Sequence, residues 1–168
     1  MLVHLGEVDK ARAALAALTE DFGDRVEVLG IEGWFALGTG DHATAEQRLS
    51  AVWQQRPDSE VAILLARAMW AQGKHEETFA LLEGWLEQQP QDLAVLLHLA
   101  GGLLSQGRDM EAISTYRRVI EIQPDHVPAL NNIAWLSRET EPERAMEYAE
   151  RAYQLAPDDP HVLDTTGM

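Results

Sequence analysis

Apolar residues recur along most of the chain at intervals of three and four positions, which is the spacing of one face of an amphipathic helix. The segment 92–125 shows this most clearly, with two stripes separated by a glycine: Leu96, Leu99 and Leu103, then Ile113, Tyr116, Val119 and Ile120. Segments of alternating, β-branched residues are nearly absent. We therefore expect an all-α protein built from pairs of antiparallel helices, with these side chains in the core.

Four kinds of position repeat with one period of 33 or 34 residues, which indicates an array of helical hairpins. The four series are expected turn glycines (Gly6, Gly40, Gly73, Gly107), small residues of the second helix (Ala11, Ala45, Thr78, Ala112, Ala145), small residues of the first helix (Gly33, Ala66, Ala100, Ala134) and prolines (Pro57, Pro90, Pro124, Pro157). Small side chains let two helices approach closely, so each repeat is expected to fold as one hairpin.

Each repeat carries signals for where its helices begin and end. Glycine tolerates the left-handed conformation that closes a helix, and proline cannot continue one because it lacks the N–H. Ser59, Asp92 and Asp159 follow the prolines and are expected to cap the next helix with their side-chain oxygens. The fifth repeat lacks the turn glycine, and Thr140 with Glu143 is expected to form a capping box there.

The period divides residues 1–168 into a single array. A partial repeat covers 1–24, full repeats cover 25–58, 59–91, 92–125 and 126–158, and a partial repeat covers 159–168. With Gly6 at a turn, the residues before it would be only the last turn of a helix. Hairpins of an array need neighbours to bury their apolar faces, so we expect either a piece of a longer array or ends that pair with another copy. In both cases the exposed ends favour self-association.

The order of these positions resembles the tetratricopeptide repeat. The stretch from Leu99-Ala100 through Gly107, Ala112, Tyr116 and Val119 to Pro124 carries that pattern nearly in full. The third repeat departs from it, because Thr78 replaces the alanine of the second helix, Leu82 the aromatic residue and Trp85 the small residue after it. The resemblance covers essentially the whole chain and implies a right-handed superhelical solenoid of antiparallel helix hairpins.

The C-terminal part is also similar to bacterial tetratricopeptide lipoproteins of exopolysaccharide and exosortase (PEP-CTERM) systems. The similarity lies in the segments 131–136, 149–152, 155–157 and 162–165, which read NNIAWL, AERA, LAP and VLDT. It implies a bacterial assembly, polysaccharide-export or protein-export system and a periplasmic or outer-membrane lipoprotein location. Without this similarity, a cytoplasmic location is the expectation.

The charge of the chain narrows the choice of partners. There are 13 basic and 28 acidic residues, a formal net charge of −15, so nucleic acid, which proteins bind through Lys and Arg on phosphates, is not expected as a partner. There is no cysteine, which excludes disulfides and zinc–thiolate sites. No apolar stretch reaches the ~18 residues that a membrane span needs. The acidity favours solubility and the steering of a basic partner.

No arrangement of residues indicates catalysis. The six histidines include no pair at i and i+4, and His42 and His75 recur just after a turn glycine, where they are expected to be solvated. The cluster of Glu139, Glu141 and Glu143 fits a helix N-terminus better than a cation site. No phosphate-binding glycine loop is present, and no nucleophile is paired with a base. We expect no enzymatic activity, no cofactor and no metal.

The tetratricopeptide resemblance implies where a partner would bind. In that family the first helices of successive hairpins line a concave groove, and the corresponding positions here are Ile31, Trp34, Ile63, Arg67, Trp70, Leu97, His98, Asn131, Asn132, Trp135 and Arg138. Trp and Arg are enriched in binding hot spots, and asparagine can bond a peptide backbone. No lysine is present to clamp a C-terminal carboxylate, so an apolar helix or extended peptide is expected. Alternatively, Trp34, Trp70 and Trp135 pack between repeats.

These observations favour a protein-interaction scaffold that binds a peptide or helix in its groove. Three alternatives stay open. The chain could be the non-catalytic arm of a larger enzyme, such as a glycosyltransferase or peptidase, or a cytoplasmic scaffold. The third alternative is that these helices only hold the array together and that binding happens elsewhere.

Overall fold

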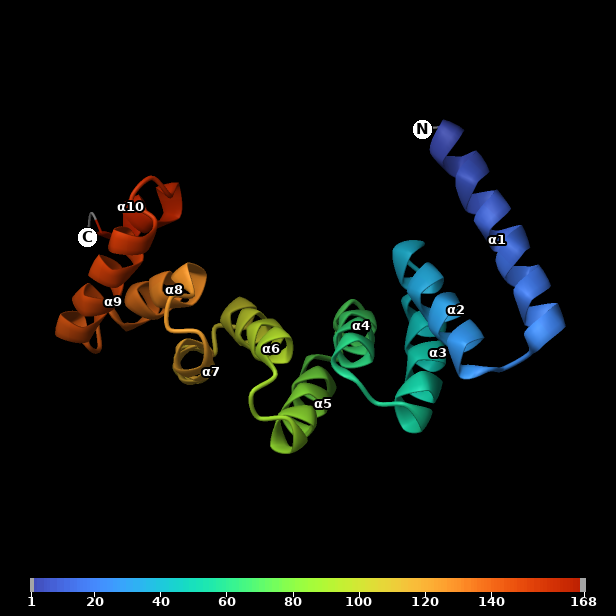
Figure 1. The fold of residues 1–168 in the computed structure, drawn as a ribbon, viewed down its shortest axis with the longest axis horizontal. Helices are drawn as coiled ribbons and strands as arrows, with labels where there is room; N and C mark the ends of the chain where they lie inside the picture. Colours follow the sequence, from blue (N-terminus) through green and yellow to red (C-terminus); the bar gives the residue numbers. More distant parts are fainter. Residues whose placement is uncertain (1, 167–168) are drawn as a thin grey trace. The chain divides into compact units, whose positions relative to one another are not determined.

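The computed structural model describes residues 2–166, with the side chains of residues 7–165. This part of the chain holds ten helices and no strand, which confirms the all-α fold (Figure 1). The helices are α1 (Leu2–Phe22), α2 (Val26–Gly38), α3 (His42–Gln55), α4 (Ser59–Trp70), α5 (His75–Gln88), α6 (Leu93–Ser105), α7 (Asp109–Ile122), α8 (Val127–Ser137), α9 (Pro142–Leu155) and α10 (Pro160–Thr166).

The chain divides into two compact units, Met1–Leu81 (unit 1) and Leu82–Met168 (unit 2). In unit 1, α2 packs against α3 as a hairpin, and α4 packs against α3. In unit 2, α6 pairs with α7 and α8 with α9, and α10 packs on the α8–α9 hairpin. Both units are therefore built from helical hairpins that stack on their neighbours in sequence.

The core of unit 1 lies between α2, α3 and α4. It consists of Ala36, Ala45, Leu49, Leu65 and Ala68, against which Leu37, Trp53, Leu64, Met69 and Leu81 pack. Gly33 is buried beside Leu49, where a Cβ would lie 2.7 Å from the Leu49 Cγ. The close approach of α2 and α3 therefore depends on glycine at this position.

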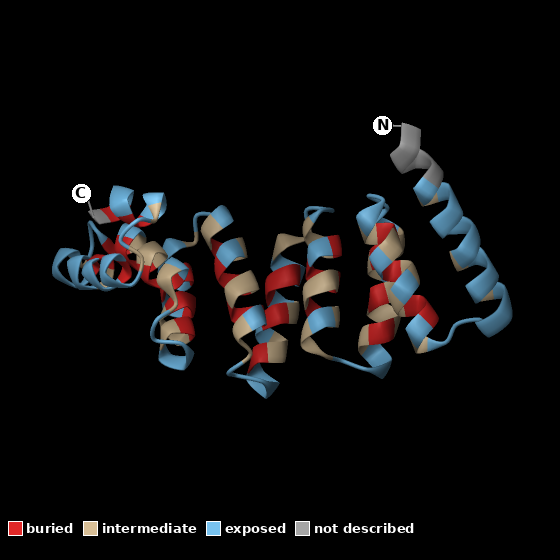
Figure 2. Ribbon diagram, turned by 45° about the horizontal axis from the view of Figure 1, so that its top comes forward, coloured by how far each residue is buried: buried red, intermediate tan, exposed pale blue. Residues whose placement is uncertain are grey.

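Helix α1 is the least buried helix of unit 1 (Figure 2). Among its described side chains only Val8, Leu15 and Thr19 are half-buried, and the others are exposed. The Thr19 hydroxyl donates a 2.6 Å hydrogen bond to the Glu32 carboxylate on α2, and Arg48 of α3 lies 2.9 Å from the same carboxylate. A polar network, rather than a broad apolar surface, attaches α1 to the α2–α3 hairpin.

The core of unit 2 includes a cluster between α8, α9 and α10. Leu130, Ala152 and Val162 are buried there, and Ile120, Val127 and Tyr148 pack against them. Two arginines connect the second helices to the loops before the first helices. Arg118 of α7 donates to the Pro90 carbonyl at 3.2 Å, and Arg151 of α9 donates to the Pro124 carbonyl at 3.0 Å.

Most of the glycines and capping residues predicted from the sequence end or cap helices in the structure. Gly40, Gly73 and Gly107 have positive φ values of 81°, 77° and 69° and end helices in the left-handed conformation. Asp92 caps α6 by accepting a hydrogen bond from the Val95 N–H, and Asp159 accepts one from the His161 N–H. Ser59, however, is the first residue of α4, whose cap is Asp58.

Besides Ser59, three local predictions are wrong. Gly6 does not lie at a turn, because α1 continues through it and ends before Gly23, whose φ is 61°. A glycine costs a helix only about 1 kcal/mol, which a long helix tolerates. Thr140 does not open a capping box, since α9 begins at Pro142 and its cap residue Glu141 makes no side-chain cap bond. The Glu141 carboxylate instead accepts hydrogen bonds from Arg117 and Arg144.

The third wrong prediction concerns the two turn histidines. His42 and His75 are half-buried rather than solvated, and the Nδ1 atom of each is buried. The His75 ring lies against Trp70, with the ring centroids 4.3 Å apart. A position at the start of the second helix therefore faces the preceding helix, which the spacing from the glycine alone does not reveal.

Candidate functional site

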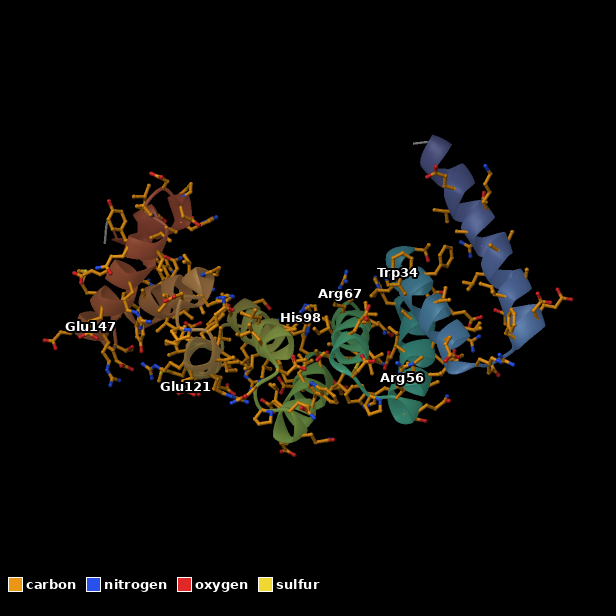
Figure 3. All side chains as sticks on the ribbon, viewed as in Figure 1. Trp34, Arg56, Arg67, His98, Glu121 and Glu147 are labelled. Atoms are coloured by element: carbon orange, nitrogen blue, oxygen red, sulfur yellow. The ribbon has the colours of Figure 1, made fainter. Side chains whose placement is uncertain are left out.

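In unit 1 the predicted groove residues lie on α2 and α4, and we call them the α2–α4 face: Ile31, Trp34, Ile63, Arg67 and Trp70. Ile31 and Trp34 leave 48% and 63% of their surface open to solvent. Arg67 is also exposed, and Figure 3 places it on the same side of unit 1 as Trp34. Ile63 is half-buried. Large exposed apolar side chains gathered on one side of a fold are typical of an interaction surface.

Trp70 differs from its neighbours on this face because it takes part in packing. Its ring lies edge-on to Phe79, with the centroids 5.7 Å apart, and Phe79 is buried. Together with His75, these rings join the end of α4 to α5. Trp70 therefore supports the fold of unit 1, and its substitution would disturb the hairpin as well as the face.

In unit 2 the predicted residues lie on α6 and α8. Leu97 and His98 of α6 are half-buried. Figure 3 shows His98 and Glu121 on opposite sides of the α6–α7 hairpin. Neither α6 residue presents the large exposed apolar surface that Ile31 and Trp34 present in unit 1.

The residues of α8 form what we call the α8 face: Asn131, Asn132, Trp135 and Arg138. Trp135 is 42% exposed, and the Arg138 guanidinium lies over its ring at 4.3 Å from the centroid. The same guanidinium donates a 2.6 Å hydrogen bond to the Trp135 carbonyl. This cation–π contact orders both side chains at the surface, so they form a preorganised aromatic platform.

A hollow of about 300 Å³ lies beside the α8 face, between the starts of α8 and α10, and we call it the Asn131 hollow. Its lining is Val127, Pro128, Asn131, Asn132, Asp159, His161 and Val162. The Asn131 Oδ1 atom is buried and has no hydrogen-bond partner in the described part of the chain. The next side chain along, Asn132, is hydrogen-bonded to Tyr116 of α7.

Tyr116 and Glu141 of unit 2 have displaced pKa values. Burial raises the pKa of the Tyr116 hydroxyl, and the hydrogen bond with Asn132 partly opposes that rise. Hydrogen bonds from Arg117 and then Arg144 lower the pKa of the Glu141 carboxyl. Neither group lies in an arrangement with a nucleophile, so these shifts reflect packing and ion pairing rather than acid–base chemistry.

The residues near the start of α10 that line the Asn131 hollow were not predicted from the sequence. Asp159, His161 and Val162 line it, yet the predicted groove ended at Arg138. The signal was available, because residues 159–162 lie one period of 33 after residues 126–129. The first helices of neighbouring repeats lie side by side, so the same count that placed α8 also places α10.

Two other features are absent from the described residues. They contain no group of three His, Asp or Glu side chains placed to hold a metal ion. Among the helices of this part of the chain, none combines the length and the apolar character that crossing a bilayer requires.

The sequence matches a known protein family and a curated relative. Residues 36–77 and 69–134 match the tetratricopeptide repeat family. The TPR repeat-containing protein PA4667 of Pseudomonas aeruginosa is 31% identical over 135 residues, which cover 78% of this chain and 23% of that protein. The chain thus spans about a quarter of the length of this curated relative.

Solved structures agree with the sequence match. YrrB, described as a TPR protein with an unusual peptide-binding site, has a TM-score of 0.74 at 18% identity, over 99% of this chain and 87% of that chain. The MamA protein has a TM-score of 0.75 at 18% identity, over 92% of this chain and 85% of that chain. These likenesses support an all-α repeat solenoid, and none of these relatives is named for an enzymatic activity. The chain belongs to the tetratricopeptide repeat family.

Proposed function

We propose that the protein is an interaction scaffold that binds a peptide or helix of a partner protein on the α2–α4 face. The observation that carries the proposal is the exposure of Trp34 beside Ile31 and Arg67. A tryptophan held largely in water offers a partner a large apolar surface at low entropic cost, since it has only two side-chain torsions. YrrB, a structural neighbour of the same fold, is described as having a peptide-binding site.

The energetics favour a short partner segment. Burial of apolar surface contributes about 25 cal/mol per Å², and an aromatic side chain buries roughly 150–250 Å² in all. A segment that covers Trp34 and Ile31 would therefore gain several kcal/mol before the cost of ordering it. Arg67 at the edge of the face would pair with a carboxylate or carbonyl of the segment and fix its register.

The setting that we propose is a bacterial assembly or a polysaccharide or protein export system. The support is the similarity of residues 131–136 and 162–165 to exopolysaccharide-associated lipoproteins, and the sequence relative in Pseudomonas aeruginosa. In that setting the protein would act at the periplasmic side of the envelope. A cytoplasmic scaffold and the non-catalytic arm of a larger enzyme are the alternatives, and the partner's own identity separates them.

Affinity capture from fractionated source cells tests the proposal. The native chain is compared with an Ile31→Ser/Trp34→Ala variant, whose exposed side chains contribute little to the core. The matched control is Met110→Ala, because Met110 is also exposed, at 65%, but lies on a second helix. A partner that the native chain and the control capture, and that the double variant loses, supports the proposal. Equal capture by all three proteins would contradict it.

A further inference from the structure

The Asn131 hollow has a chemistry that the proposed function does not use. Val127, Pro128 and Val162 give it an apolar side, and Asn131, Asn132, Asp159 and His161 give it a polar side. A volume of about 300 Å³ is large enough for one long side chain and too small for a helix. A hollow of this size and mixture fits a single anchoring side chain with an apolar stem and a polar end.

Asn131 supplies an unsatisfied acceptor at this hollow. Its Oδ1 atom is buried and lacks a hydrogen-bond donor among the described residues. Leaving a buried acceptor unpaired costs about 1–3 kcal/mol, so its natural complement is a donor from outside the chain. Asn131 lines the hollow, and the last torsion of an asparagine side chain is soft, so its amide can reorient to meet a ligand there.

The charge of the surroundings decides which donor fits. Asp159 places a carboxylate in the lining, where one oxygen accepts the His161 N–H at 2.9 Å, and no Lys or Arg of the described chain lines the hollow. Residues 82–168 contain 15 acidic and six basic side chains. The Asp159 carboxylate and the acidic surroundings therefore favour a cationic donor over a neutral one.

We propose that the Asn131 hollow is a pocket for a lysine side chain of a partner protein, an inference that rests on the proposed scaffold function. The four-carbon stem of lysine packs along Val127, Pro128 and Val162. Its ammonium, which has three donors, bonds to the Asn131 carbonyl and the Asp159 carboxylate. Asn131 lies on α8 and Asp159 just before α10, so the two acceptors suit a compact ammonium better than the planar fork of arginine.

Unit 1 provides a natural counterpart that lacks this chemistry. A hollow of about 240 Å³ lies between the starts of α2 and α4, lined by Val26, Glu27, Val52, Arg56, Asp58, Glu60 and Val61. Glu27, Asp58 and Glu60 place carboxylates there beside a single cation, Arg56, but the lining holds no asparagine. The counterpart therefore serves as an internal control for non-specific attraction to the acidic surface.

The test is a titration of the isotope-labelled chain with N-acetyl-lysine methylamide, followed by NMR. We expect the side-chain amide of Asn131 and the backbone amide of His161 to shift in a saturable way, while Glu60 and Val61 do not shift. Asp159→Asn should weaken the binding about fivefold, which is the scale of one partly exposed ion pair. Asparagine caps helices as well as aspartate does, so α10 stays folded in this variant.

Control compounds separate lysine recognition from other causes. The Nε-acetylated compound, which has no charge, and N-acetyl-arginine methylamide should bind more weakly than the lysine compound. The absence of a saturable shift at Asn131, equal shifts with the uncharged compound, or equal shifts at Glu60 would each overturn the pocket. The titration requires no partner protein, so its failure leaves the α2–α4 face standing, and a failed capture experiment leaves this result unaffected.

Discussion

Units 1 and 2 follow the same repeat period but present different surfaces on their first helices. In unit 1, α2 exposes Ile31 and Trp34, whereas α8 of unit 2 has a polar pair, Asn131 and Asn132, beside a hollow. The period fixes the positions that pack in the core, and it leaves the outward positions free to differ. Two units of one fold can therefore present different anchors, one apolar and one polar.

The polar connections between hairpins also differ. In unit 2, Arg118 and Arg151 each bond to the carbonyl of a loop proline, and the corresponding position of α3 in unit 1 is Ala51. Unit 1 instead uses Glu46 of α3, whose carboxylate lies 2.7 Å from the Lys74 ammonium. Repeats that keep the same helix packing thus use different side chains to connect their hairpins.

The largest expected effect on stability comes from a substitution in the core of unit 2. Leu130 is fully buried between α8, α9 and α10, so Leu130→Ala should lower the free energy of unfolding by about 2–5 kcal/mol. Hydrogen exchange should show the loss of protection first in residues 82–168. The matched substitution in unit 1 is Leu49→Ala, which should weaken residues 1–81 first. Equal loss in both units from either substitution would mean that they unfold as one.

A second substitution tests the close approach within unit 1. Gly33→Ala would place a Cβ 2.7 Å from the Leu49 Cγ and should cost about 1–3 kcal/mol of stability through overpacking. Gly30→Ala, on the same helix with open space around it, should instead stabilise by about 0.5–1 kcal/mol. Thermal unfolding of the two variants measures the difference. Similar effects of both substitutions would show that α2 and α3 can separate without penalty.

Substitutions of the two neighbouring asparagines of α8 test their different roles in unit 2. Asn132→Leu removes the partner of the buried Tyr116 hydroxyl and should cost about 1 kcal/mol. Asn131→Leu removes an oxygen that has no partner among the described residues and should leave stability unchanged or slightly higher, while it abolishes binding of N-acetyl-lysine methylamide. Denaturant unfolding and the NMR titration measure both effects. A larger stability loss for Asn131→Leu than for Asn132→Leu would assign Asn131 a structural role.

The smallest expected effect is the pH dependence of one ion pair. Arg117 and Arg144 lower the pKa of the Glu141 carboxyl below its usual 4.5. The stability from this pair is therefore present above pH 4.5 and is lost as the pH falls through the lowered pKa. Arg117→Met should reduce the free energy of unfolding at pH 7. The reduction should become smaller as the pH falls below the pKa of Glu141. If Arg117→Met reduced stability equally at pH 7 and below the pKa of Glu141, the ion pair would not be the cause of the reduction.

Local signals in the sequence predicted the helix ends better than they predicted which side chains are exposed. Gly40, Gly73 and Gly107 end helices as expected because the left-handed conformation is a property of the residue itself. Gly6 satisfied the period but lies within α1, since nothing else in its neighbourhood stops the helix. The Asn131 hollow escaped prediction because it joins side chains one repeat apart. Trp34 and Trp70 both lie on first helices, and only the neighbouring rings of His75 and Phe79 distinguish the packed tryptophan from the exposed one.

The most direct test of the scaffold function is photo-crosslinking at position 34 in source cells. The chain carries p-benzoylphenylalanine in place of Trp34, and a matched chain carries it in place of the equally accessible Met110. The account predicts a discrete crosslinked product at position 34 that is absent at position 110 and that contains a peptide of one partner protein. Products of the same kind at both positions, or none at position 34, would contradict binding on the α2–α4 face.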